Sequence, residues 1–237
     1  MRTAAIVPAA GRGERLGPGV PKALRQLGGA PLLVHAVRAL SRARSLDLVV
    51  VAAPAADVAA VERLLADFEW SAEVQVVAGG ADRHESVGLA LAALPADVDV
   101  VLVHDAARPL APTELVEAVA ATVRSRADAC IPVVPLADTV KEIAADSVVR
   151  TLDRTMLRAV QTPQGFRRAA LAKAHAWAAG AGAEVRASIT DDAGLIERLG
   201  LCVVAIPGAE EAFKVTRPLD LLAAEALLVR QRADGAR

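Results

Sequence analysis

Short apolar runs alternate with segments of helical spacing along most of the chain, and this alternation limits the fold more than any other feature. Strands are predicted at residues 4–7, 46–53, 74–77, 98–104, 130–135 and 201–206. Helices are predicted at residues 31–41, 56–68, 84–94, 113–123, 168–179, 191–199 and 218–231. Strands joined by helices of this length form right-handed βαβ crossovers. We therefore expect an α/β protein: a single Rossmann-like domain over residues 1–237 with a mainly parallel, twisted sheet and flanking helices.

One stretch, residues 136–159, interrupts the alternation. Two segments of alternating character, 138–143 and 148–152, flank residues 144–147, which is the pattern of a β-hairpin. The stretch offers few side chains to a core, and an isolated hairpin is marginally stable in water. We therefore expect an arm that projects from the domain, packs on a second copy of the chain and makes the protein a homodimer.

Charge and composition exclude several classes of protein. The chain has 27 Lys and Arg against 28 Asp and Glu, so it lacks the basic surplus of a general nucleic-acid binder. No apolar run reaches the roughly 18 residues of a membrane span, and the first residues do not follow the pattern of a secretion signal. Two cysteines, Cys130 and Cys202, are too few for a disulfide framework, and both are expected to be buried thiols. We expect a cytoplasmic protein with no nucleic-acid or membrane partner.

A loop of small residues follows the first predicted strand and carries Gly11 and Gly13. Small residues let backbone N–H groups approach a phosphate closely. The dinucleotide-binding pattern needs a third glycine where this chain has Leu16, and the Gly-Lys-Ser/Thr of a P-loop is absent. Arg15 and Lys22 follow, placed to hold a triphosphate from two sides. An ordinary strand-to-helix turn with solvated charges is the alternative, but the whole phrase favours phosphate binding.

Asp105 follows the fourth predicted strand. Open α/β sheets bind ligands at the carboxyl ends of their strands. A carboxylate there is suited to Mg²⁺, whose remaining ligands are usually phosphates and water. Arg108, three residues further on, is suited to an anionic substrate. From position alone, a cap on the following helix explains Asp105 equally well.

The histidines are given no chemical role. His104 ends a buried strand, where core packing with one satisfied ring nitrogen is expected. His35, His84 and His175 fall on predicted helices and show no metal-ligand spacing among themselves.

Taken together, eight phrases resemble those of the 2-C-methyl-D-erythritol 4-phosphate cytidylyltransferase family of the non-mevalonate isoprenoid route. They are PAAGRGER at 8–15 with PK at 21–22, GGADRHESV at 79–87, VHDAARP at 103–109, DTVK at 138–141, DR at 153–154, QTPQ at 161–164, TDDA at 190–193 and KVTRP at 214–218. One phrase would be weak, but eight in the family's order, across nearly the whole chain, make the resemblance specific. It implies a sheet of the nucleotidyltransferase type.

The resemblance implies a transfer of CMP from CTP to 2-C-methyl-D-erythritol 4-phosphate. Pyrophosphate leaves, 4-diphosphocytidyl-2-C-methyl-D-erythritol forms, and no covalent enzyme intermediate is involved. The catalytic residues implied are Arg15 and Lys22, which would hold the triphosphate and steady the leaving pyrophosphate, and Lys214 near the α-phosphate. Asp105 is implied as the ligand of Mg²⁺ or another divalent cation.

The resemblance also implies two binding regions. The nucleotide would lie on Ala9, Ala10, Gly80 and Ser86, beside the loop glycines Gly11 and Gly13. The acceptor would lie on Asp105, Arg108, Thr139, Thr162 and Thr190. Arg154, in the arm, would serve the site of the other subunit. Two positions depart from the family pattern, Ala81 and Ala212, where relatives often carry polar residues; both affect the detail of nucleotide binding rather than the reaction class.

Three other readings stay open. A sister cytidylyltransferase for another polyol phosphate, such as ribitol 5-phosphate, would share the nucleotide loop and Asp105. A nicotinamide-dependent oxidoreductase would need a glycine at Leu16 and an acidic residue after the second strand, and neither is present. A non-catalytic nucleotide-binding module would be expected to lack Lys22, Asp105 or Lys214, and all three are present.

Overall fold

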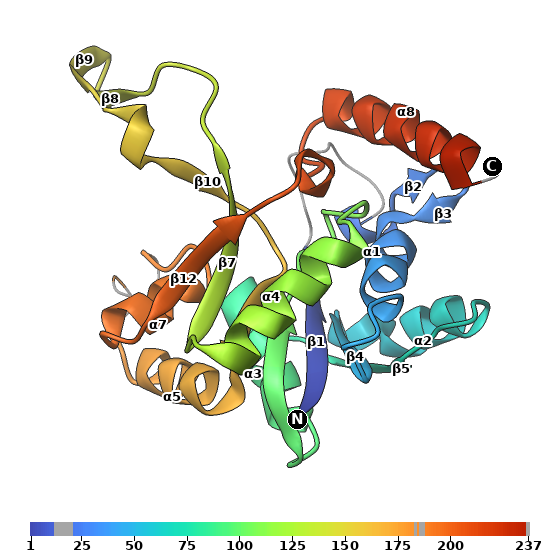
Figure 1. Cartoon of the computed structure of the whole chain (residues 1–237). Helices are drawn as coiled ribbons and strands as arrows, with labels where there is room; N and C mark the ends of the chain where they lie inside the picture. The colour runs from blue at the N-terminus through green and yellow to red at the C-terminus, as the bar shows by residue number, and fades with distance from the viewer. Residues whose placement is uncertain (12–20, 183, 185–187, 236–237) are drawn as a thin grey trace.

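The computed structural model describes residues 1–11, 21–182, 184 and 188–235, and an eight-stranded sheet forms its centre (Figure 1). In their order across the sheet, the strands are β10 (Arg158–Val160), β7 (Ala129–Pro135), β11 (Gln164–Arg167), β6 (Val98–Val103), β1 (Arg2–Pro8), β4 (Leu48–Ala53) and β5 (Glu73–Ala78); β12 (Val203–Pro207) also pairs with β7.

One half of the sheet is entirely parallel. Strands β6, β1, β4 and β5 run in the same direction, and Ala4 of β1 pairs with Leu48 on one side and Val101 on the other. All six residues of β4 are buried, as its run of valines predicts for a strand covered on both faces. The predicted α/β fold with a parallel core is therefore confirmed, and the carboxyl ends of these strands meet at one edge of the sheet.

Helices cover both faces of the sheet. They are α1 (Leu32–Ser41), α2 (Val58–Ala66), α3 (Arg83–Ala93), α4 (Thr113–Ser125), α5 (Arg168–Ala179), α7 (Ala193–Arg198) and α8 (Pro218–Gly235). Apolar side chains of α1, α2 and α4 pack in one core cluster, and those of α3, α5 and α7 pack in another. Among the described residues, no helix is both long and apolar enough to cross a membrane.

The sheet is mixed rather than simply parallel, because a short strand that the sequence did not predict lies in its middle. Strand β11 inserts antiparallel between β6 and β7. Phe166 is fully buried there. At Gly165, a Cβ atom would lie 2.6 Å from a methyl carbon of Val119 on α4, so only glycine lets the helix pack this closely. Strand β10 and the small pair β2 (Gln26–Leu27) and β3 (Ala30–Pro31) were also not predicted.

The predicted hairpin is confirmed. Strands β8 (Lys141–Ala144) and β9 (Ser147–Thr151) pair antiparallel, and the arm they form projects away from the sheet in Figure 1. The turn between them holds Ala145 with a positive φ of 50°. Every residue of both strands is exposed, including the apolar side chains of Ile143, Val148 and Val149. The arm therefore presents an exposed apolar surface.

The two cysteines differ from each other. Cys130 lies in β7 and is buried, as predicted, and burial raises the pKa of its thiol to about 11. The prediction is wrong for Cys202, which is exposed. It lies one residue before β12 at the end of the sheet, where its N–H donates to a carboxylate oxygen of Asp128 at 3.1 Å and its carbonyl accepts the N–H of Ala129 at 3.0 Å.

Candidate functional site

A cavity of about 250 Å³ lies at the carboxyl edge of the parallel strands. The loop after β1, the start of α3 and the turn after β6 form its walls. Seven residues that the sequence singled out line it: Ala9, Ala10, Gly11, Lys22, Ser86, Asp105 and Lys214. Arg83 also lines it, and sequence reasoning assigned that residue no role. The fold thus brings together residues from separate phrases of the sequence.

Asp105 is the carboxylate at the centre of this cavity. Its side chain is only 12% exposed and faces three cations: Lys214 Nζ at 2.7 Å, Arg83 Nε at 3.4 Å and Arg108 Nε at 3.8 Å. Burial by itself would raise the pKa of Asp105, but the charges of Arg83 and Lys214 outweigh it and hold the pKa well below its usual range. Asp105 therefore stays ionised at any ordinary pH and keeps Lys214 and Arg83 directed at the cavity.

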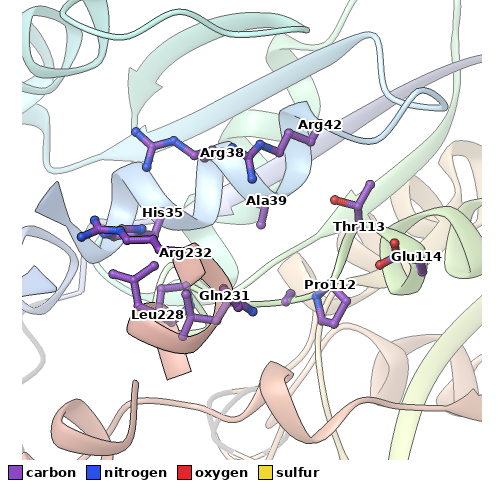
Figure 2. A pocket seen from close by; sticks show the side chains of 13 residues that line it. His35, Arg38, Ala39, Arg42, Pro112, Thr113, Glu114, Leu228, Gln231 and Arg232 are labelled. Carbon is purple, nitrogen blue, oxygen red and sulfur yellow. The ribbon is translucent and has the colours of Figure 1, made fainter. Parts of the chain in front are cut away.

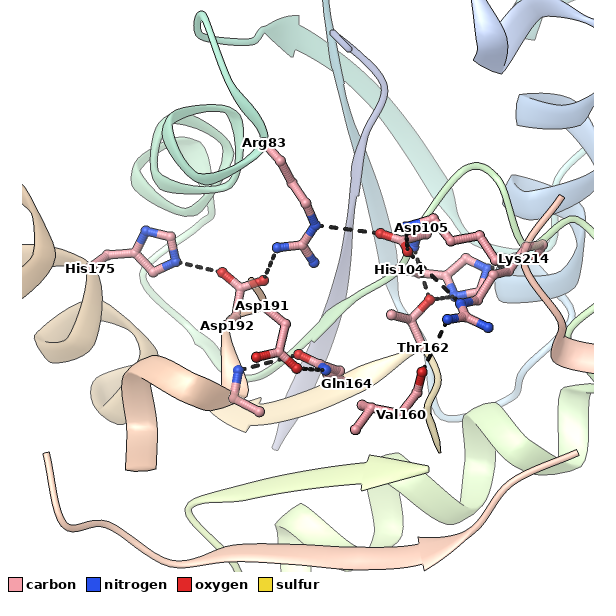
Figure 3. A network of polar contacts seen from close by, with 12 residues as sticks. Arg83, His104, Asp105, Val160, Thr162, Gln164, His175, Asp191, Asp192 and Lys214 are labelled. Atoms are coloured by element: carbon pink, nitrogen blue, oxygen red, sulfur yellow. Dashed lines mark hydrogen bonds and ion pairs between the residues drawn. The ribbon is translucent and has the colours of Figure 1, made fainter. Parts of the chain in front are cut away.

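The ion pairs continue inward from Arg83 (Figure 3). Arg83 Nη1 lies 2.6 Å from Asp192, a fully buried residue whose other oxygen accepts a hydrogen bond from His175 Nε2 at 2.9 Å. Burial opposes the charge of Asp192, yet Arg83 keeps the pKa of this carboxyl below its ordinary value. Arg83 thus connects a buried anion to the cavity anion Asp105, which fixes the guanidinium between two opposite charges.

The structure also brings two histidines together that lie far apart in the sequence. Helices α3 and α5 pack side by side, so the rings of His84 and His175 stack at 4.2 Å with an angle of 5° between them. Their nitrogens and an oxygen of Asp192 lie within 4.8 Å of one another. A ring nitrogen binds a metal in the plane of its ring, and parallel stacked rings do not direct two lone pairs at one ion. Because Asp192 is also paired with Arg83, this cluster is better explained as packing than as a metal centre.

The loop between β5 and α3 shows why glycine and serine are needed there. At Gly79, a Cβ atom would lie 2.9 Å from both Ala10 Cβ and Ser86 Oγ, so the backbone must approach the β1 loop closely. Ser86 Oγ donates to the carbonyl of Asp82 at 2.7 Å and accepts the N–H of Gly80 at 3.1 Å. Asp82 in turn caps α3 by accepting the N–H of Glu85 at 2.8 Å. The serine hydroxyl therefore holds the loop in shape beside the cavity.

Thr162 lies beneath the cavity instead of lining it. Its hydroxyl oxygen accepts the N–H of Asp105 at 3.0 Å and lies 3.1 Å from His104 Nδ1. Burial lowers the pKa of His104 to about 4, so the ring is neutral. The consistent assignment has the Thr162 hydroxyl donating to Nδ1 and the Nε2–H donating to the carbonyl of Arg108 at 3.1 Å. The two side chains thus tie down both ends of the turn 105–108, and His104 is the core residue that was predicted.

Arg108 is also buried beside the turn, and its side chain joins separate segments of the chain. Its guanidinium donates to the carbonyl of Ala212 at 2.6 Å and to that of Val160 at 3.1 Å. It therefore connects the base of the arm to the segment before Lys214.

The alternative role of Asp105 as a cap on the following helix is wrong, because Pro112 occupies the N-cap of α4.

Three further predicted residues, Thr139, Arg154 and Thr190, do not line the cavity of the single chain. Thr139 and Arg154 lie at the exposed base of the arm, where Arg154 donates to the carbonyls of Leu136 and Ala137. Thr190 is also exposed. Gly13 and Arg15 lie outside the described residues.

The donor set of the cavity fits a divalent cation. Asp105 is the carboxylate among its described lining residues, and Mg²⁺ usually takes one or two carboxylates and completes its shell with phosphates and water. Both carboxylate oxygens face cations, Oδ1 toward Arg83 and Oδ2 toward Lys214. A metal ion bound to Asp105 would therefore share this carboxylate with Arg83 and Lys214.

Comparison with known proteins agrees with this site. The sequence matches the family described as 2-C-methyl-D-erythritol 4-phosphate cytidylyltransferase over residues 3–230. A protein of that name from Frankia casuarinae is 61% identical over 238 residues, covering 100% of this chain and 85% of that protein. One from Streptomyces coelicolor is 54% identical, covering 98% and 86%. The crystal structure of the Thermus thermophilus protein of that name is 36% identical, with a TM-score of 0.76 and 96% and 98% of the two chains covered.

Proposed function

The chain belongs to the 2-C-methyl-D-erythritol 4-phosphate cytidylyltransferase family, and from this premise we propose how its cavity carries out the reaction. The enzyme transfers CMP from CTP to 2-C-methyl-D-erythritol 4-phosphate, a step of non-mevalonate isoprenoid biosynthesis. Pyrophosphate is released and 4-diphosphocytidyl-2-C-methyl-D-erythritol forms. The observation that carries the proposed mechanism is the meeting of Lys22, Asp105 and Lys214 in one cavity beside the glycine loop.

The chemistry requires charge neutralisation and positioning more than a base. A phosphate oxygen of the acceptor attacks the α-phosphorus of CTP, and the bond from that phosphorus to the β-phosphate oxygen breaks. The attacking phosphate is already anionic at neutral pH, so no side chain has to remove a proton. The barrier is lowered by holding the two anions in line and by stabilising charge on the leaving pyrophosphate.

We assign these tasks to the basic residues of the cavity. Lys22 and Arg15 hold the triphosphate and steady the leaving pyrophosphate. Lys214, 2.7 Å from Asp105, is fixed where its ammonium can face both the α-phosphate and the incoming phosphate. Arg83 lines the same wall and acts with them.

The backbone of the loops then receives the nucleotide. Close approach at Gly79 brings the two loops together, so N–H and carbonyl groups can read cytosine and ribose without large side chains. The residues proposed for this role are Ala9, Ala10, Gly11, Gly13, Gly80 and Ser86.

Asp105 is the residue that would hold Mg²⁺ or another divalent cation, with the remaining ligands coming from phosphate oxygens and water. When bound, such an ion neutralises phosphate charge. Lys22 and Lys214 add positive charge from the chain itself, which also neutralises phosphate charge.

The acceptor site is proposed to be completed by a homodimer. Thr139 and Arg154 are exposed on the arm of the single chain, and so are the apolar side chains of Ile143, Val148, Val149 and Met156. A two-fold dimer buries both arms at once. Arg154 of one subunit would then reach the acceptor phosphate at the other subunit's cavity, next to Thr190, while Arg108 and Thr162 support the floor. A cytoplasmic location, where CTP and phosphorylated acceptors are present, is part of the same proposal.

The test of acceptor identity is release of pyrophosphate from CTP with a panel of polyol phosphates that includes ribitol 5-phosphate. We expect release with 2-C-methyl-D-erythritol 4-phosphate at a kcat/KM at least about 10³-fold above the other acceptors, because unpaired polar groups discriminate strongly between acceptors. The role of Lys22 is tested in the same assay with Lys22→Ala, and Lys173→Ala, which removes an exposed lysine on α5, is its matched control. A higher kcat/KM with ribitol 5-phosphate would contradict the assignment.

A further inference from the structure

A second and larger cavity, of about 570 Å³ (Figure 2), shares no described lining residue with the cavity around Asp105, which is called the CTP cavity below. Helix α1 forms one wall, α8 another, and residues 109–114 close the third side. Figure 2 shows Arg38 on α1, Arg42 directly after α1, Arg232 on α8, and Glu114 across from them. None of these four residues has a role in the proposed reaction.

The cavity carries an excess of positive charge. Three guanidiniums face one carboxylate, Glu114, which leaves two positive charges uncompensated. Within the described part of the chain, Arg38, Arg42 and Arg232 form no ion pair. Arg232 donates to the carbonyl of Gly28 at 3.1 Å, and Arg38 lies 5.6 Å from the centre of the Phe68 ring. Hydrogen bonding and stacking of this kind leave the charges unneutralised.

The charges are close enough to repel one another. The pKa of Arg38 is lowered by burial and then by the charges of Arg42 and Arg232. His35, buried behind them, has its pKa lowered mainly by burial, with Arg38 and Arg232 adding to the effect. Its Nε2 lies 2.8 Å from the carbonyl of Leu27, so the neutral ring donates there and adds no charge. The arrangement therefore favours an anion that relieves repulsion among the three arginines.

The shape and lining indicate the kind of anion. A planar guanidinium can donate two parallel hydrogen bonds to two oxygens of a phosphate group. An excess of two positive charges is neutralised better by a phosphate or diphosphate than by a single carboxylate. The volume falls in the range of small-molecule pockets, so it holds more than a lone phosphate. Leu110 and Leu228, both nearly buried, supply an apolar floor for an organic part. We propose that this cavity binds a small molecule bearing a phosphate or diphosphate group, at a site separate from that of CTP.

The same apolar floor reaches the CTP cavity. Leu110 and Leu228 share one cluster with Leu27 and Val215. Val215 follows Lys214, and its N–H donates to the carbonyl of Ala107 at 2.8 Å, within the turn that starts at Asp105. A molecule bound in the larger cavity would therefore contact the apolar cluster that includes Val215, the residue after Lys214. Binding of that molecule does not depend on the proposed function.

The experiment uses inorganic diphosphate as the probe and calorimetry to measure its binding. Lys22→Ala with Lys214→Ala provides a background in which the CTP cavity is weakened. In that background we expect one diphosphate still to bind per chain. Adding Arg42→Gln and Arg232→Gln should weaken this binding about 100-fold, roughly tenfold for each charge-assisted hydrogen-bonding group that is removed. Diphosphate that does not bind in the background would overturn the proposal.

The control changes net charge equally but away from the cavity. Arg44→Gln with Arg63→Gln removes two exposed arginines that do not line it, and should alter the affinity less than about 2-fold. Equal weakening by both pairs would mean non-specific attraction and would contradict a built site. If Arg232→Gln is destabilised because its hydrogen bond to Gly28 is missing, Arg42→Gln alone still tests the site through a tenfold weaker affinity. In the otherwise unchanged enzyme, Arg42→Gln should leave CTP turnover unaltered, so failure of this site is distinguishable from failure of the proposed function.

Discussion

Replacement of Asp105 by asparagine tests the electrostatic centre of the site. The substitution keeps the shape and removes the charge that Lys214 meets at 2.7 Å and Arg83 at 3.4 Å. Breaking a buried ion pair by removing one partner costs about 3–5 kcal/mol. Three features reduce this figure: Lys214 is 37% exposed, Arg83 keeps Asp192, and burial by itself disfavours the Asp105 charge. We therefore expect a loss of about 1–3 kcal/mol in the free energy of unfolding at pH 7.

The dependence on pH follows from the lowered pKa of Asp105. A carboxyl whose pKa is lower in the folded than in the unfolded state stabilises the fold at pH values above the unfolded pKa, about 3.9. That contribution is lost as the pH falls toward the folded pKa. The stability difference between the wild type and Asp105→Asn should therefore be constant near neutrality and decline progressively below a pH of about 4.

Urea denaturation from pH 7 to pH 3 measures this difference, and Asp67→Asn, an exposed residue after α2, is the control with no expected loss. Turnover at pH 7 should fall by about 10²-fold or more, as when one electrostatic stabiliser is removed. A stability difference that stays the same down to pH 3 would refute the view that the charge of Asp105, paired with Lys214 and Arg83, is what stabilises this region.

Three further substitutions test separate parts of the account. Lys22→Ala should lower kcat by about 10²-fold or more with the melting temperature nearly unchanged, since a loop lysine buries little; near-normal turnover would remove Lys22 from the mechanism. Thr162→Val should lower the free energy of unfolding by about 1–3 kcal/mol and slow turnover, because the Asp105 N–H and His104 lose their buried partner. Thr162→Ser keeps the hydroxyl and should behave like the wild type. Equal effects of the two substitutions would contradict the hydrogen-bond argument. Equal amounts of Arg154→Ala and Lys22→Ala subunits, mixed and exchanged, should recover about a quarter of wild-type activity, because half the dimers are mixed and each has one intact site. No recovery after proven exchange would show that Arg154 serves its own subunit.

The parallel core and the position of Asp105 could be predicted because both depend on local pattern. The run of valines in β4 and the apolar residues of β6 define buried parallel strands, and Asp105, two residues after β6, must then lie at the binding edge of the sheet. The arm was predictable for the opposite reason, since its alternating pattern provides no core.

What the sequence did not reveal depends on contacts between distant segments. Arg83 and Asp192 are 109 residues apart, and their pairing exists only because α3 and the start of α7 meet on one face of the sheet. Strand β11 is four residues long, and its burial depends on α4 packing against Gly165. The hydrogen bond from the Asp105 N–H to the Thr162 hydroxyl joins residues 57 positions apart, and the sequence pattern did not indicate it. Pairing of this kind leaves no periodic signal along the chain.

The central claim is that this cavity transfers the cytidylyl group directly between two phosphates, by charge and alignment and without an enzyme nucleophile. Ser86 supplies the hydroxyl among the described lining residues, and both its donor and an acceptor position are already used within the loop. The stereochemical course at the α-phosphorus tests this most directly. With CTP made chiral by sulfur at the α-phosphorus, the account predicts a product of inverted configuration, the result of one in-line displacement. Retention of configuration would require two displacements through a covalent enzyme intermediate and would contradict the account.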